Sequence, residues 1–370
     1  MNKPLIKWAG GKERELKYIL PIIPNFKNYY EPFLGGGALF FRLENEGNFY
    51  VNDLSFDLIN FYLNLKRQDK FFFKELGFIN SNWKALDLLA DTNKRNFLKI
   101  YKEYSNKNVD LDFYKQSVDK FIFDHLDEIN KFCFPYQIKK TLVDEIKISI
   151  LSKSKRMMKL EEKKGRLIDK DIIDNIKGAL KNGYYTYLRG LYNSPDKFKN
   201  DSSLLAVLFL FLRTFCFSGM FRFNRSNHFN VPYGGIGYNK NNFDKKLNIF
   251  KEDNLLNKLK KTQIYNLDFE EFFNIHSPEK DDFIFLDPPY DTEFSTYDKN
   301  TFNHDDQIRL ANYLINKCKG KWLLVIKNTE FISKLYKKQN IEINSFKKKY
   351  NVSFMNRNVR DTQHLLITNF

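Results

Sequence analysis

Residues 283–290 read Phe-Ile-Phe-Leu-Asp-Pro-Pro-Tyr, a short apolar run followed by an acid, two prolines and a tyrosine. This pattern is typical of a buried strand, which ends at the prolines because proline has no N–H to donate to a neighbouring strand. A strand that ends there aims a carboxylate and an aromatic ring into one cleft. Such a pair suits a planar ring with an exocyclic amine, whose hydrogens need acceptors and whose face can stack on tyrosine. The candidate residues are Asp287, Pro288, Pro289 and Tyr290.

Both ends of the chain alternate between strand-like and helix-like patterns. We expect strands at 29–33, 49–53, 263–268, 282–287, 322–326 and 363–369, and helices at 12–20, 38–43, 54–66 and 305–319. This alternation indicates an α/β fold with a doubly wound, mostly parallel sheet. In such sheets the ligand lies beyond the carboxyl ends of the strands. Four acids at or near expected strand ends therefore predict one shared site: Glu31, Asp53, Asp268 and Asp287.

The composition is basic, with 61 Lys and Arg against 45 Asp and Glu and a formal net charge of +16 over 370 residues. An excess of positive charge on an ordered chain fits a polyanionic partner, most simply nucleic acid. The Lys- and Asn-rich usage of an AT-rich genome explains the same composition equally well. The three cysteines are scattered and the N-terminus has no signal-peptide pattern, so we expect a cytoplasmic protein without disulfides or zinc. No stretch of the sequence is long and apolar enough to span a bilayer.

Two glycine-containing segments precede expected helices. Residues 31–37 read Glu-Pro-Phe-Leu-Gly-Gly-Gly, and glycine lets a backbone approach a ligand closely. This is neither Gly-x-Gly-x-x-Gly nor a P-loop, so a nicotinamide or flavin dinucleotide is not indicated. Residues 8–12 hold a tryptophan, whose face can bind a cationic sulfonium or an adenine, and a lysine. Taken alone, each segment is also explained as a structural turn, and Asp53 as a helix cap.

The middle of the chain has a different character. Residues 68–201 are rich in Lys, Asp and Asn with helical periodicity, and their basic runs are typical of solvated helix faces. Residues 215–234 interleave aromatics with Arg and Asn, which suits base stacking and contacts to phosphates and base edges. A β-hairpin with an aromatic core explains this segment equally well. No histidine has metal-ligand or catalytic-triad spacing, so metal-dependent hydrolysis and serine acyl chemistry are not indicated.

Taken in order, these segments resemble the Dam-type, alpha-class adenine-N6 DNA methyltransferases. The matching blocks are 7–12, 31–37, 52–53, 58–60, 222–224, 229–234, 287–290 and 365–369. The resemblance implies methyl transfer from S-adenosyl-L-methionine to a flipped adenine at a specific site in duplex DNA. It also implies a seven-stranded methyltransferase sheet with a large, mainly helical insertion. Residues 1–66 and 243–370 would form the catalytic domain, and 67–242 the target-recognition domain, with a helical extension at 67–201 and a β-hairpin at 213–238.

The resemblance assigns roles position by position. The target adenine would be held by Asp287, Pro288, Pro289 and Tyr290. Cofactor contacts are implied for Trp8, Ala9, Gly10, Gly11, Lys12, Glu31, Pro32, Phe33, Gly35, Gly37, Asp53, Asp268, Phe269 and Asp287. DNA contacts are implied for Phe217, Ser218, Arg222, Asn224, Arg225, Asn230 and Tyr233. The expected partners are double-stranded DNA and, within a restriction–modification system, a restriction endonuclease encoded nearby, with no metal and no membrane.

The chain departs from the family in three places, one of which is the closing strand, where Gln363 and His364 stand at positions that often carry an acid in the family. The segment between residues 60 and 204 is much longer than the family's compact recognition domain, and it either reads a longer or asymmetric site or serves to stabilise or oligomerise the protein. The hairpin tip at 224–228 differs from that of enzymes reading GATC, with Arg225 in place of an apolar residue, so GATC specificity is not implied. Two alternative functions stay open: a methyltransferase of RNA or of a protein amide, and a non-catalytic DNA-binding module on the same fold.

Overall fold

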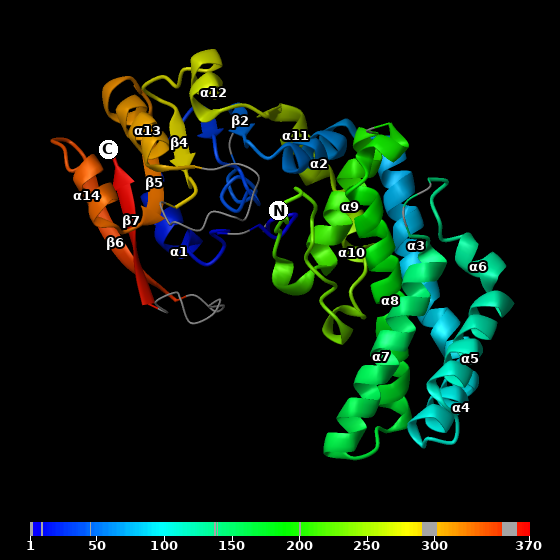
Figure 1. Ribbon diagram of the computed structural model, residues 1–370. Coiled ribbons are helices and arrows are strands. Elements are labelled where there is room, and N and C mark those ends of the chain that lie inside the picture. The colour runs from blue at the N-terminus through cyan, green and yellow to red at the C-terminus, as the bar shows by residue number, and fades with distance from the viewer. Residues whose placement is uncertain are drawn as a thin grey trace. The chain divides into compact units, whose positions relative to one another are not determined.

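The computed structural model describes residues 3–8, 10–44, 46–136, 138, 140–199, 201–290, 302–349 and 361–370. It contains two compact units (Figure 1). The first, here called the sheet unit, combines Met1–Lys66 with Phe250–Phe370, and the second, the helical unit, is Arg67–Ile249. The helical unit is therefore an insertion in the sequence of the sheet unit, and it extends to Ile249 where the sequence suggested a boundary at 242.

Within its described residues the sheet unit has seven strands: β1 (Tyr29–Glu31), β2 (Phe49–Asn52), β3 (Thr262–Tyr265), β4 (Phe283–Leu286), β5 (Lys321–Lys327), β6 (Glu342–Lys349) and β7 (Asp361–Thr368). Their order across the sheet is β3-β2-β1-β4-β5-β7-β6. The pairs from β3 to β5 are parallel, and β7 runs antiparallel to β5 and β6. The prediction of a doubly wound, mostly parallel seven-stranded sheet is confirmed. Strand order reverses between β1 and β4, the position at which such sheets bind ligands.

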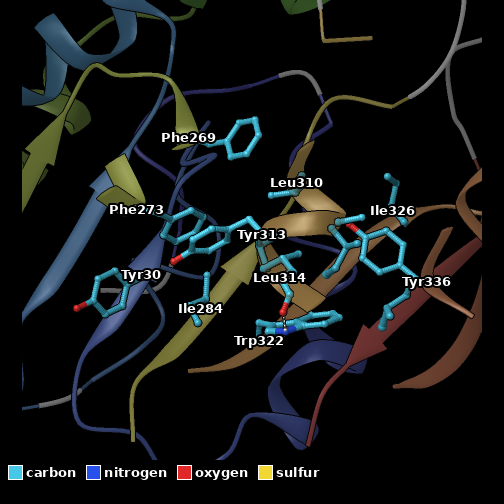
Figure 2. Close-up of a cluster of buried hydrophobic side chains, with 14 of the residues drawn as sticks. Tyr30, Phe269, Phe273, Ile284, Leu310, Tyr313, Leu314, Trp322, Ile326 and Tyr336 are labelled. Carbon is cyan, nitrogen blue, oxygen red and sulfur yellow. Dashed lines mark hydrogen bonds between the residues drawn. The ribbon is translucent and has the colours of Figure 1, made fainter. Parts of the chain in front are cut away.

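The described helices of this unit are α1 (Leu16–Ile19), η1 (Leu20–Ile22), α2 (Phe56–Arg67), α11 (Asp253–Lys261), α12 (Phe269–Ile275), α13 (His304–Asn316) and α14 (Glu330–Tyr336). Alternate residues of the central strands pack with α12, α13 and α14 into one apolar cluster (Figure 2). Within it the rings of Phe273 and Tyr313 stack with centroids 4.3 Å apart. The Trp322 indole N–H donates to the Leu314 carbonyl at 3.2 Å. This packing fixes α13 against the strands whose ends carry the candidate motif.

The opposite face of the sheet packs against α2, α11 and residues 34–43. Phe40 contacts Phe49 of β2 with centroids 5.6 Å apart, and Phe41 contacts Tyr62 of α2 at 6.1 Å. The helix expected at 38–43 is not formed. These residues make successive turns, with the Phe41 N–H donating to the Gly37 carbonyl at 3.0 Å. So short a segment makes too few i→i−4 bonds to offset the cost of helix nucleation.

The helical unit is formed by α3 (Lys70–Thr92), α4 (Lys94–Ser105), α5 (Leu111–Asp124), α6 (Leu126–Asn130), α7 (Leu142–Lys164), α8 (Asp169–Tyr192), η2 (Pro195–Phe198), α9 (Ser202–Phe215), η3 (Phe217–Gly219), η4 (Ile236–Tyr238) and α10 (Asp244–Ile249). Helix α8 packs against α3, α4, α7 and α9 and forms the centre of the unit. Gly183 permits the close approach of α7, because a Cβ there would lie 2.7 Å from the Cα of Ile146.

The hairpin expected at 213–238 is present in an irregular form. Helix α9 continues to Phe215, and the antiparallel pairing is limited, in the described residues, to the bridges Cys216–Tyr233 and Phe223–Phe229. Ser218 and Gly219 have φ of 55° and 64°, a left-handed conformation that interrupts an extended strand. The segment therefore forms a paired loop with an aromatic base instead of a regular two-stranded ladder.

Candidate active site

The carboxyl ends of β1, β2 and β4 lie at one edge of the sheet, because these strands are parallel and β1 pairs with both of the others. Glu31 ends β1, Asp53 follows β2 and Asp287 follows β4. Both aspartates interact electrostatically with Glu31, and both raise its pKa. The sheet thus gathers three of the four predicted acids at its switch point.

Asn52 and Asp53 join the loops that follow neighbouring strands. The Asn52 amide donates to the carbonyls of Pro32 (3.1 Å) and Leu267 (2.9 Å), and its oxygen accepts from the Leu267 N–H (2.9 Å). The Asp53 carboxylate accepts from the N–H groups of Gly35 (2.8 Å) and Ser55 (2.9 Å). These bonds hold the loops after β1, β2 and β3 in one fixed arrangement.

The glycine loop lies against Trp8. Gly35 has φ of +49° and Gly37 has φ of +66°, which disfavours residues with a Cβ. A Cβ at Gly35 would lie 2.7 Å from Cδ1 of Trp8, so glycine is also required for space. The Tyr62 hydroxyl donates to the Gly35 carbonyl at 3.2 Å. The loop is therefore shaped by its contacts and does not precede a helix N-terminus, contrary to expectation.

Glu31 is buried, with 2% of its surface exposed. Burial raises the pKa of its carboxyl well above the usual value, against the opposing effect of a hydrogen bond from the Tyr29 hydroxyl at 2.9 Å. On the same side of the sheet, burial lowers the pKa of Lys258 to about 8. A protonated carboxyl at this position can ionise when a cation approaches, since an adjacent positive charge favours the carboxylate.

Lys12 connects the N-terminal segment to the end of β4. Its ammonium group pairs with the Asp287 carboxylate and donates to the Tyr290 hydroxyl (3.0 Å) and the Gly10 carbonyl (3.2 Å). It also lies 5.2 Å from the centre of the Tyr290 ring. Lys12 is 2% exposed and the Asp287 side chain 20% exposed, so the pair is largely shielded from water. The side chains of Asp287 and Tyr290 are thus both held by the buried ammonium group of Lys12.

The two prolines of the motif differ in their surroundings. Pro288 is buried and Pro289 exposed. The Pro289 carbonyl accepts a hydrogen bond from the side-chain amide of Gln307 in α13 at 2.9 Å. Among the described residues, no donor bonds to the Pro288 carbonyl. One acceptor of the motif is consequently occupied by the protein, and the other is left beside Asp287.

Asp268 and Phe269 begin α12, at the same edge of the sheet. The Asp268 carboxylate caps the helix by accepting from the Glu270 N–H (2.9 Å), and the same oxygen accepts from Arg309 (2.6 Å). The Phe269 ring lies 5.8 Å from that of Phe33 and 5.9 Å from that of Phe302. An acid thus lies beside a cluster of aromatic faces, a combination that suits an adenine ring.

The predicted DNA contacts lie in the helical unit, and their surroundings differ. Phe217, 47% exposed, and Arg225 are at the surface. Arg222 donates to the Asn230 oxygen at 3.3 Å, so these two side chains pair with each other. Asn224 shapes the loop tip, because its oxygen accepts from the N–H groups of Ser226 (3.0 Å) and His228 (2.9 Å).

Ser218 and Tyr233 differ from the other predicted DNA contacts in their surroundings. Ser218 is exposed and carries the positive φ noted above. Tyr233 is 7% exposed, packs against Trp83 and Tyr185, and donates to Asn239 at 2.7 Å. Tyr233 is therefore a core residue of its unit, and its ring, with the hydroxyl already bonded, is not on a surface that DNA can reach.

Sequence reasoning did not find Gln307, Arg309 or Tyr62. Gln307 and Arg309 lie on α13 and contact Pro289 and Asp268, from which they are far apart along the chain. The local sequence shows only that a helix begins there, through the reciprocal cap of Asn303 and Asp306. One predicted cofactor residue, Ala9, lies outside the described residues.

No group of three or more His, Cys, Asp or Glu residues suited to a metal ion occurs in the described part of the chain. Among the same residues, no helix has the length and apolarity needed to cross a membrane.

A family model described as D12 class N6 adenine-specific DNA methyltransferase matches residues 8–175 and 150–352. The chain belongs to this family. It is therefore an adenine-specific DNA methyltransferase, and the family resemblance inferred from the motifs is confirmed. The alternatives of an RNA or protein-amide methyltransferase and of a non-catalytic module are not supported.

Several named relatives align with most of the chain. The Type II methyltransferase M.CviBI of Paramecium bursaria Chlorella virus NC1A is 26% identical over 372 residues, covering 100% of both chains. The Type II methyltransferase M.MjaIII of Methanocaldococcus jannaschii is 27% identical, covering 92% of this chain and 90% of its own. The DNA adenine methylase of Haemophilus influenzae is 24% identical, covering 90% and 83%. The long segment of this chain is therefore spanned by alignments to relatives of similar length.

Proposed function

We propose that this methyltransferase binds S-adenosyl-L-methionine at the carboxyl edge of the sheet unit and transfers its methyl group to an adenine flipped out of duplex DNA. The observation that carries this proposal is the cluster of Lys12, Asp287 and Tyr290 at the end of β4, with the buried Glu31 on the neighbouring strand. It combines carboxylates and an aromatic ring at the switch point of the sheet.

The described residues fit S-adenosyl-L-methionine, the methyl donor, which carries its methyl group on a cationic sulfur. Asp287 provides a carboxylate, and the buried Glu31 carboxyl can ionise when a cation approaches. The glycine loop, fixed through Asp53, leaves backbone without side chains where a ligand would approach. Asp268 and the ring of Phe269 would receive the adenine of the donor, since one oxygen of Asp268 has no bond to the described residues and can accept from an amine.

The target amine is a poor nucleophile because its lone pair is delocalised into the adenine ring. We assign the Asp287 carboxylate and the Pro288 carbonyl as acceptors of its two hydrogens. Both acceptors favour a pyramidal nitrogen whose lone pair points at the methyl group, and positioning of this kind supplies most of the acceleration. They also stabilise the positive charge that develops on nitrogen. The proton leaves to Asp287 or to water after transfer.

Flipping the base costs a few kcal/mol, because stacking and pairing in the duplex are lost. Stacking on the Tyr290 ring offsets this cost, since a base–aromatic stack contributes roughly 1–3 kcal/mol. Tyr290→Ala should therefore weaken capture of the target base more than binding of the cofactor. Tyr290→Phe keeps the ring and loses the bond that Lys12 donates to the hydroxyl, so it should retain base capture. Equal losses of base and cofactor binding in Tyr290→Ala would argue against the stacking role.

The catalytic assignment is tested with Asp287→Ala and a matched variant, Asp281→Ala, in which an exposed acid just before β4 is removed. Transfer of tritiated methyl groups to duplex DNA should be abolished in Asp287→Ala and unchanged in Asp281→Ala. Calorimetric titration should show that Asp287→Ala still binds the cofactor, although more weakly. Methylation by Asp287→Ala at a rate near that of the wild type would refute the assignment.

We assign DNA recognition to the helical unit, in which the loop at 213–238 supplies exposed Phe217, Arg222 and Arg225. Helix α7 offers a second surface. Lys155, Lys159 and Lys163 are exposed and follow one another at a spacing of four residues, so they form one row along the helix. No ion pair involving them is found in the described residues. A row of unpaired cations on one helix face matches the phosphates of a DNA strand.

This assignment predicts a salt dependence. Lys155→Gln/Lys159→Gln should lower the slope of log Kd against log salt concentration by about 2, because each phosphate contact contributes about 0.9. The matched control is Lys115→Gln/Lys120→Gln, in which both cations already pair with aspartates on the same helix. Identical slopes for both variants and the wild type would show that α7 does not contact DNA.

Two of the relatives are named Type II methyltransferases, and we infer the same role for this chain: protection of one sequence in a restriction–modification system. Sequencing that detects methylated adenine in DNA from cells expressing the protein should find modification at a single sequence motif. Modification spread over unrelated sequences would contradict this role.

A further inference from the structure

Gln307, on the first turns of α13, is fully buried, with 0% of its surface exposed. Its side-chain nitrogen donates to the Pro289 carbonyl at 2.9 Å. Its side-chain oxygen is also buried and has no hydrogen-bond partner among the described residues. A buried amide with one group unsatisfied costs free energy, so the bond to Pro289 offsets only part of the cost of burying Gln307.

The torsion angles of the motif show what this bond can do. The rings of Pro288 and Pro289 fix their φ angles. Asp287 and Pro288 each precede a proline, which restricts their ψ angles to the extended range. The ψ angle of Pro289 and the φ angle of Tyr290 are therefore the least restricted backbone torsions between Asp287 and the Tyr290 side chain. Rotation about the first of these moves the Pro289 carbonyl and the Tyr290 ring together.

We propose that Gln307 is a positioning residue for methyl transfer. By holding the Pro289 carbonyl, it fixes the ψ angle of Pro289, and this angle sets where the Tyr290 backbone, and with it the ring, begins relative to the Asp287 carboxylate. The same bond keeps the Pro289 carbonyl turned toward α13, which leaves the Pro288 carbonyl as the acceptor beside Asp287. This inference rests on the proposed role of Tyr290 in stacking on the target base.

Helix α13 is a rigid support for this task. Its N-terminus is closed by the reciprocal cap of Asn303 and Asp306. One turn further on, Arg309 bonds to Asp268 (2.6 Å), Glu270 (2.9 Å) and Asp306 (2.8 Å). Because several bonds fix the start of the helix, the side-chain amide of Gln307 has a defined position. The position of the Pro289 carbonyl, to which it donates, follows from it.

The test uses Gln307→Met, which keeps the size of the side chain and removes the donor. The target adenine is replaced by 2-aminopurine, which fluoresces when it leaves the stack, and turnover is measured in parallel on unmodified DNA. We expect about a tenfold loss in kcat and in flipped-base fluorescence, the equivalent of one hydrogen bond. The KM for the cofactor and the melting temperature should change little. Gln263→Met, at an exposed glutamine of the same unit, should behave as the wild type.

A double-mutant cycle with Tyr290→Ala distinguishes a role in positioning the Tyr290 ring from a role in the stability of the fold. If Gln307 acts through the Tyr290 ring, Gln307→Met should have no further effect on base capture once that ring is absent. Additive losses would overturn the inference. If Tyr290→Ala lowers flipped-base fluorescence and Gln307→Met does not, the inference fails and the stacking role of Tyr290 stands. If neither lowers it, the stacking role itself fails.

Gln307→Glu provides a second readout should Gln307→Met fold poorly. A carboxyl donates to the Pro289 carbonyl only while it is protonated, and burial favours the protonated form. The ratio of variant to wild-type kcat should therefore rise as the pH falls. A ratio that is constant with pH would overturn the inference.

Discussion

Lys12→Met keeps the length of a buried side chain and removes its charge. In the wild type the ammonium group pairs with Asp287, and only 2% of Lys12 and 20% of the Asp287 side chain are exposed. Removing one partner of a buried ion pair costs about 3–5 kcal/mol, because the remaining charge stays shielded from water. Since 20% of the Asp287 side chain is exposed to solvent, we expect Lys12→Met to lower the free energy of unfolding by about 3 kcal/mol.

For a unit of this size, each kcal/mol lowers the melting temperature by about 2–4 °C. Differential scanning calorimetry of the free protein should therefore show a decrease of about 6–12 °C for Lys12→Met. Lys260→Met, which removes an exposed lysine of the same unit, should stay within about 0.5 kcal/mol of the wild type.

Asp287→Asn completes a double-mutant cycle. The double variant should be more stable than the two single losses predict when added, because neither uncompensated charge remains, and couplings of about 0.5–3 kcal/mol are usual for contacting groups. If Lys12 served only to contact the cofactor, the free protein would lose no stability in Lys12→Met. A melting temperature within about 1 °C of the wild type, with additive effects in the cycle, would refute this reasoning.

Three further changes test the edge of the sheet. Because the pKa of Glu31 is raised in the folded protein, the wild type loses stability as the pH rises above about 4.5, where the carboxyl ionises in the unfolded chain. Chemical denaturation should therefore find Glu31→Gln more stable than the wild type at about pH 8 and equally stable at about pH 4. A gain in stability that does not depend on pH would contradict this. Gly35→Ala should cost about 1–2 kcal/mol from its positive φ and displace Trp8, seen as lower thermal stability and altered tryptophan fluorescence; an unchanged spectrum would argue against the contact. The pKa of Lys258 is lowered to about 8, so between about pH 8 and pH 10.5 the unfolded chain binds more protons than the folded protein, and the free energy of unfolding rises with pH. Denaturation curves of Lys258→Met should not show this rise.

Strands β1, β2 and β4 were predictable, because their apolar runs are short and end at acids or prolines. Strand β6, Glu342–Lys349, was not found, and its place explains why. It lies at the edge of the sheet, pairs only with β7 within the described residues, and reads Glu-Ile-Asn-Ser-Phe-Lys-Lys-Lys. Only Phe346 gives a buried side chain in its described part. Lysine-rich edge strands of this kind avoid association with other chains, and they lack the alternation that identifies a strand.

The site was predictable where one motif carries its own chemistry, as with Asp287 and Tyr290. Pairings between distant segments were not. Nothing in the spacing of Lys12 from Asp287 indicates that the lysine reaches the acid instead of a ligand, and the bond forms only because the parallel sheet brings residues 275 positions apart together. Tyr233 shows the opposite error, because an aromatic residue among polar neighbours suits DNA contact and core packing equally well, and its 7% exposure decides for packing.

Helix α13 explains why the two halves of the site depend on each other. Gln307 holds the proline motif that faces the target base, and Arg309, two positions later, holds Asp268 on the side assigned to the donor. Residues two apart on a helix point in different directions, so one helix can reach both loops while it remains packed on the sheet. A small rotation of α13 would move both contacts at once. The position of the methyl donor relative to the target base therefore depends on the packing of the buried face of α13, through Leu310 and Leu314, as much as on the residues that contact the two substrates.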